Sequence, residues 1–253
     1  MEDNAVTGAV MEEGPKMSFF ERVTGIFLEP TKTFADINRL SSWLGIFLIL
    51  AVMTMAVGYV SSIRIDPEMA MRKAMDASPF KMTEEQKDLA VKAGIARQRN
   101  PLFKYGSLVL TPLASLVVYL AIAGVFLLIF VIMGAPLTYK KSLAVTIWGF
   151  APASIVLSIV SVILMFVKAP ENIDLTNMVT SNLGPLVDSK AHPVLGSLLA
   201  SIDIFSLWMI VLLSIGFAAI SAKKLTTKKA ATGIVMVWAL YVLVKLGYRA
   251  IFS

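Results

Sequence analysis

The chain has 253 residues, of which 57% are hydrophobic and 16% charged, and its formal net charge is +6. With a mean hydropathy of +0.76 it is too apolar to keep its surface in water, which excludes a soluble globular protein and indicates a membrane protein. The absence of cysteine excludes disulfides, thiolate metal sites and a cysteine nucleophile. The positive charge suits a position beside anionic lipid, and no patch that combines aromatic and basic residues indicates nucleic-acid binding.

The N-terminal segment is predicted to be a polar tail followed by two short amphipathic helices. Residues 1–17 are polar and lack the apolar core of a signal peptide, so we expect a disordered tail. In residues 18–42, Pro30 is suited to begin a second helix, and the preceding apolar residues share one helical face. This face consists of Phe19, Phe20, Val23, Ile26 and Phe27. We predict interfacial helices that lie against the membrane and cap the bundle.

Five apolar runs follow, and each is predicted to span the membrane, which takes about 20 residues. They cover residues 43–63, 105–133, 142–167, 194–222 and 230–252. The last run contains Lys245 and Arg249 near its end, where long basic side chains can reach the interface or form an ion pair. The predicted fold is an all-α integral membrane protein, in which residues 43–252 form a bundle of five transmembrane helices.

The first loop, residues 64–104, is predicted to carry a helix outside the membrane. It contains nine Lys or Arg and six Asp or Glu residues. Thr83 can cap a helix, and Gln86 three residues later completes a capping box, so we predict a helix from 84 to about 98. An odd number of crossings separates this helix from the basic turn at residues 223–229, which places the two on opposite sides. A solvated face is the default interpretation, and contact with a partner is the alternative.

Basic residues in the short turns determine the predicted orientation. A cytoplasmic N-terminus places Lys140 and Lys141, and the four lysines of residues 223–229, in two tight cytoplasmic turns, as the positive-inside rule favours. The total count of Lys and Arg favours the opposite orientation, but the charges of the first loop are mixed and resemble those of a folded unit. We therefore predict a cytoplasmic N-terminus.

Asp203 is the one acidic residue inside an apolar run. An unpaired acid costs about 2.5 to 3.5 kcal/mol at the bilayer centre. With a turn near Thr226 and about 1.5 Å per residue, Asp203, Lys245 and Arg249 reach similar depths on the outer side, and the two bases share a helical face. We predict that Asp203 pairs with one or both bases in a structural role; proton or substrate handling is the alternative.

Two stripes of small residues are predicted to let helices approach closely in lipid. They are Gly196, Ser206, Ser214 and Ser221 on the fourth span, and Ser154, Ser158 and Ser161 on the third. Packing within the chain is the default interpretation of both stripes. An intermolecular interface is the alternative.

The sequence favours a protein without enzymatic activity, cofactor or metal. A membrane hydrolase needs a nucleophile with a base, a metal site or paired acids, whereas this chain offers one acid within its spans and one histidine, His192, in a loop. A small-solute or ion transporter or channel is the competing hypothesis, because Pro112 and Pro152 could interrupt helices and free carbonyl groups for an ion. Prolines near the start of a span, however, are tolerated as kinks, and no internal repeat relates the two halves.

The order of these elements resembles bacterial members of the Yip family, which is named for eukaryotic relatives that bind Ypt/Rab GTPases. The resemblance covers roughly residues 18–252. Its motifs are Glu29-Pro30 with Phe34, Asp203-Ile204-Phe205 with Trp208, and Lys228-Lys229-Ala230. The resemblance implies a five-span bundle with a cytoplasmic N-terminus in the bacterial inner membrane. Some bacterial relatives accompany ABC-type exporters, so it also implies a scaffold or accessory subunit whose partners are the bilayer and a membrane protein such as an exporter permease.

Overall fold

A computed structural model describes residues 16–76, 82–173, 178–188 and 191–252, so most of the predicted disordered tail lies outside the described residues. The described part is helical, and the all-α membrane bundle predicted from the sequence is confirmed. The helices in chain order are α1 (Phe19–Leu28), α2 (Pro30–Leu40), α3 (Leu44–Arg64), α4 (Pro67–Asp76), α5 (Glu84–Arg99), α6 (Pro101–Ile132), α7 (Tyr139–Val167), α8 (Pro193–Leu199), α9 (Ile204–Ile220) and α10 (Thr227–Phe252). Short 3-10 turns occur at Pro170–Asn172 and Gly184–Leu186.

Within the described residues, four helices are long and apolar enough to cross a membrane: α3, α6, α7 and α10. The fifth, α9, has 17 residues and is about 25 Å long, which is less than the roughly 30 Å of the hydrocarbon core. The apolar run 194–222 is therefore not one continuous helix, because residues 200–203 separate α8 from α9. Pro112 and Pro152, where a break was considered, instead lie inside the continuous helices α6 and α7.

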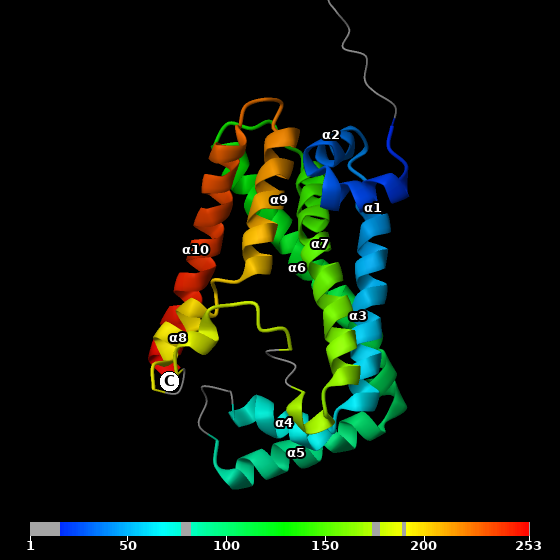
Figure 1. The fold of residues 1–253 in the computed structure, drawn as a ribbon, viewed down its shortest axis with the longest axis vertical. Helices are drawn as coiled ribbons and strands as arrows, with labels where there is room; N and C mark the ends of the chain where they lie inside the picture. The colour runs from blue at the N-terminus through cyan, green and yellow to red at the C-terminus, as the bar shows by residue number, and fades with distance from the viewer. Residues whose placement is uncertain (1–15, 77–81, 174–177, 189–190, 253) are drawn as a thin grey trace, which may run out of the picture.

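Helix α7 is the centre of the bundle and packs against α3, α6 and α9 (Figure 1). The core between α6 and α9 is aromatic: the ring of Phe217 lies 4.5 Å from that of Phe130 and 5.2 Å from that of Phe126. Helix α9 approaches its neighbours closely at Gly216, where an added Cβ would lie 2.6 Å from Val145 Cγ1. Glycine at this position thus permits the contact between α9 and α7.

The N-terminal hairpin, defined as α1 and α2, lies across one end of the bundle beside the turn between α9 and α10 (Figure 1). It occupies the segment in which two short helices were expected, and Pro30 is the first residue of α2. Helix α2 packs mainly against α9. Its side chains Phe34 and Ile37 are almost completely buried, so the hairpin is part of the folded core.

The distal helix pair, defined as α4 and α5, lies at the opposite end of the bundle (Figure 1). Thr83 and Gln86 form the predicted capping box at the start of α5. Arg72 contacts Asp88 at 2.8 Å, and Lys87 contacts Asp76 at 2.7 Å, which joins the two helices. The hydrogen bond with Asp76 is the main reason why the pKa of Lys87 is raised.

The distal pair is also attached to the bundle. Lys73 Nζ donates a hydrogen bond to the carbonyl oxygen of Glu171 at 2.6 Å, and Arg64 Nε donates to that of Met165 at 3.0 Å. These bonds connect α3 and α4 to the end of α7 and the segment that follows it. The distal pair is thus an ordered unit, in the place where the sequence predicted a helix opposite the basic turn.

The opposite positions of α5 and the basic turn predict opposite accessibility in a cell. The chain has no cysteine, so single cysteines can replace Glu85 and Lys228, which are both exposed; Lys87 is less suitable because its ammonium group is engaged by Asp76. With a cytoplasmic N-terminus, an impermeant maleimide should label Glu85→Cys in intact cells and Lys228→Cys only after permeabilisation. Equal labelling of both variants in intact cells would contradict the topology. Labelling of Lys228→Cys alone would show that the orientation is the reverse of the predicted one.

Candidate functional site

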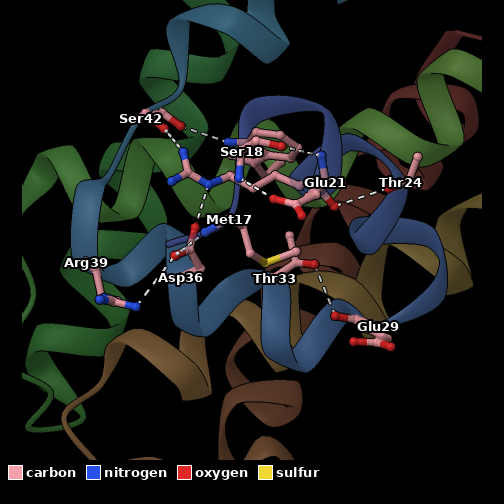
Figure 2. A network of polar contacts seen from close by, with 11 residues as sticks. Met17, Ser18, Glu21, Thr24, Glu29, Thr33, Asp36, Arg39 and Ser42 are labelled. Carbon is pink, nitrogen blue, oxygen red and sulfur yellow. Dashed lines mark hydrogen bonds and ion pairs between the residues drawn. The ribbon is translucent and has the colours of Figure 1, made fainter. Parts of the chain in front are cut away.

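A buried ion pair connects the two helices of the N-terminal hairpin. Arg22 Nε of α1 lies 2.6 Å from Asp36 Oδ2 of α2, and the two side chains are only 6% and 5% exposed. The other carboxylate oxygen accepts a hydrogen bond from the backbone N–H of Met17 at 3.3 Å and lies 3.8 Å from Arg39. Figure 2 shows Asp36 between Met17 and Arg39.

The ion pair extends into the bundle through Ser42, in the linker between α2 and α3. Arg22 donates a hydrogen bond from a terminal guanidinium nitrogen to Ser42 Oγ at 2.7 Å, and Trp148 Nε1 of α7 donates to the Ser42 carbonyl oxygen at 2.8 Å. Trp148 is 1% exposed. The chain Asp36–Arg22–Ser42–Trp148, called the hairpin lock below, fixes the N-terminal hairpin to the central helix.

Local sequence explains how the hairpin lock is positioned. Ser18 and Glu21 form a capping box at the start of α1, and the hydrogen bonds with Ser18 lower the pKa of Glu21. Arg22 follows Phe19 by three residues and precedes Ile26 by four, so it lies on the apolar face of α1. Arg22 was not among the residues predicted from the sequence, although an arginine within an apolar helical face indicates a buried partner.

The hairpin lock has the chemistry of a structural site. Asp36 and Arg22 each have several partners within the protein. Such a buried pair specifies one arrangement of its helices, because either charge alone would be buried without compensation. The site therefore fixes the geometry of the hairpin on the bundle.

A second polar cluster lies at the start of α9, where the fourth apolar run is interrupted. Asp203 is the N-cap of α9: its Oδ1 accepts hydrogen bonds from the backbone N–H groups of Phe205 at 2.9 Å and Ser206 at 3.1 Å. Its Oδ2 accepts a short hydrogen bond from Ser181 Oγ. The backbone N–H of Ile204 also donates to the Ser181 carbonyl oxygen at 3.2 Å, so the preceding loop is joined to the start of α9.

Lys245 has different partners from those of Asp203. Its Nζ donates to Ser201 Oγ at 3.0 Å and to the Ser197 carbonyl oxygen at 3.4 Å. Among the residues that the structure describes, the hydrogen bonds of Lys245 thus go to Ser201 and Ser197, and the pairing of Asp203 with Lys245, Arg249 or both stays a prediction. The interruption of the fourth run adds a local role for Asp203, because it begins a new helix and its carboxylate satisfies the free N–H groups there. Arg249 lies one helical turn beyond Lys245.

The small residues expected to mediate helix packing occupy several environments. Ser214 and Ser221 are buried and donate to carbonyl oxygens of their own helix, those of Ile210 and Ala218. Gly196 is buried in α8, and Ser206 lies in the first turn of α9. The remaining three, Ser154, Ser158 and Ser161, are half-buried along α7. Their role in packing, within the chain or between chains, stays a prediction.

The described residues contain no group of three or more His, Cys, Asp or Glu side chains that could hold a metal ion. His192 precedes the first residue of α8, and its backbone N–H donates to the Asp188 carbonyl oxygen at 2.9 Å.

These features define a class: a multi-pass α-helical membrane protein with a helical hairpin locked onto one end of its bundle. Within that class, the family model of the Yip1 domain matches residues 24–248. The chain belongs to this family, whose members are generally non-enzymatic membrane proteins, and the resemblance seen in the sequence is confirmed at the level of the family. No curated protein and no solved structure matches the chain significantly.

Proposed function

We propose that this Yip1-domain protein is a non-enzymatic scaffold or accessory subunit of a complex in the bacterial inner membrane. An ABC-type exporter is the first class of partner to test, because the sequence resembles the bacterial Yip family, some members of which accompany such exporters. The observation that carries the proposal is the hairpin lock. Its buried charges contact one another and Ser42, which holds the surface of the N-terminal hairpin in place.

The N-terminal hairpin has the surface that an assembly role requires. Phe20 is 77% exposed and Leu28 is 81% exposed, although both belong to a helix whose other face is fixed in the core. Exposed apolar side chains on an ordered surface indicate contact with lipid or a protein partner. Because the hairpin lock fixes the hairpin before binding, the cost of ordering it on association is small.

A second candidate function, transport of a small solute or ion, is favoured by the interruption between α8 and α9. Transporters often build their sites from discontinuous helices whose ends face a substrate. Here Asp203 occupies the free N–H groups at the start of α9, which reduces the capacity of this helix end to bind an anion. The accessory function therefore has the stronger support.

Affinity purification in mild detergent, followed by mass spectrometry, tests the proposal. The tagged full chain should recover a membrane subunit, such as an exporter permease, in stoichiometric amount. Replacing Phe20 and Leu28 together with serine should reduce this recovery at least severalfold. The matched control is serine at Leu128 and Ile132, which are exposed on α6 away from the hairpin, and it should leave recovery unchanged.

Two outcomes would contradict the proposal: the first concerns its accessory function, and the second concerns the N-terminal hairpin as the binding surface. One is a lone, monodisperse protein that moves ions or small solutes across liposome membranes, which would establish transport instead. The other is a partner whose recovery falls equally in the hairpin variant and the α6 variant. That result would show that the N-terminal hairpin is not the surface that binds it.

A further inference from the structure

A cavity of about 450 Å³ lies between α6, α9 and α10, within the part of the protein that spans the membrane. Its volume is in the range of small-molecule binding sites, about 300 to 1,000 Å³. One end is lined by Phe126, Leu213 and Ile234, and the other by Ser201, Ser206 and Lys245. The cavity is therefore amphipathic along its length, and its polar end lies at the interruption between α8 and α9.

The two ends of the cavity are separated along the direction of the helices. Ile234 and Lys245 both lie on α10 and are about 16 Å apart along its axis, at 1.5 Å per residue. Tyr241 lies between them, lines the same cavity and is 63% exposed. The cavity thus opens to the outer surface of the bundle, where α10 faces the bilayer.

The polar end of the cavity carries the ammonium group of Lys245, which forms no ion pair with a carboxylate among the described residues. Lys245 has three N–H donors, and among the described residues two of them are directed to Ser201 and Ser197. Asp203, the acidic residue of the fourth apolar run, caps α9 and accepts a hydrogen bond from Ser181. Arg249, one turn beyond Lys245, adds a second basic group on the same face of α10.

We propose that this cavity binds one anionic phospholipid of the surrounding bilayer. The acyl chain occupies the apolar end beside Phe126, Leu213 and Ile234, and the phosphate accepts a hydrogen bond from the remaining donor of Lys245. Long basic side chains near the end of a span reach the interface, where a lipid phosphate supplies a counter-charge from the membrane itself. The opening beside Tyr241 lets the chain enter laterally from the bilayer. This inference does not depend on the proposed accessory function.

Native mass spectrometry of the full chain in detergent, with matched amounts of phosphatidylglycerol and phosphatidylcholine added, tests the site. The natural chain should retain one phosphatidylglycerol in preference to phosphatidylcholine. Lys245→Gln should lower this retention about tenfold, which corresponds to the loss of one charge-assisted hydrogen bond. Met209→Trp, which places a larger side chain in the cavity, should lower the retention of both lipids.

Matched controls distinguish the site from general attraction to lipid. Lys228→Gln removes an exposed charge at the other end of α10, and Met236→Trp enlarges an exposed side chain outside the cavity; both should bind like the natural chain. Equal retention of the two lipids by the natural chain would overturn the proposal. So would full retention in Met209→Trp, which keeps the test decisive if Lys245→Gln does not fold.

Discussion

Replacing Asp36 with leucine is expected to destabilise the folded protein by about 3 to 5 kcal/mol, because it leaves the guanidinium group of Arg22 buried without its counter-charge. Arg22→Met should have a similar effect, since it strands the carboxylate of Asp36. Thermal unfolding in detergent, followed by circular dichroism, measures the change. Trp148 and Ser42, the other members of the hairpin lock, remain in place in both variants.

The double variant Arg22→Met with Asp36→Leu separates the ion pair from simple loss of packing. Replacing both members of a buried pair with apolar side chains is often nearly neutral, so the double variant should recover much of the stability lost in each single variant. Arg72→Gln is the matched control on the surface, where the ion-pair side chains are 40% and 51% exposed, and it should cost less than about 1 kcal/mol. A double variant that is as unstable as the sum of the single variants would contradict the hairpin lock.

The parts of the fold that could be predicted from the sequence are those encoded locally. The long apolar runs of α3, α6, α7 and α10 identify spans because the bilayer requires each span to satisfy its own backbone hydrogen bonds. The start of α5 was predictable because Thr83 and Gln86 bond to one another's backbone across a single turn. The capping box of Ser18 and Glu21 is the same kind of local signal, although it was not among the features predicted from the sequence.

The hairpin lock could not be predicted in the same way, because its partners come from separate elements. Arg22 and Asp36 are fourteen residues apart in the sequence, and Ser42 and Trp148 are joined only when α2 packs beside α7. The interruption of the fourth apolar run, in contrast, could have been predicted from the sequence. An Asp before an apolar segment is a typical helix N-cap, but the hydrophobicity of residues 194–222 as a whole concealed the break.

Asp203 provides the second large expected effect, because its carboxylate caps α9 and also binds Ser181. Asp203→Leu should destabilise the protein by about 1 to 2 kcal/mol, the usual cost of losing an N-cap. Asparagine caps helices about as well as aspartate, so Asp203→Asn should retain most of the stability although it removes the charge. The same unfolding measurement as for Asp36 applies.

The choice between capping and an ion pair rests on two comparisons. If Asp203 acts as the cap, Asp203→Leu and Lys245→Leu have separate partners, and their effects on the free energy of unfolding should add to within about 0.5 kcal/mol. If the carboxylate instead neutralises basic residues of α10, Asp203→Asn should be as harmful as Asp203→Leu. Adding Lys245→Leu and Arg249→Leu should then restore stability, because no buried charge would remain. If the Asp203→Asn protein is stable, and the losses of stability in Asp203→Leu and Lys245→Leu add, the acid within this apolar run serves to begin a helix.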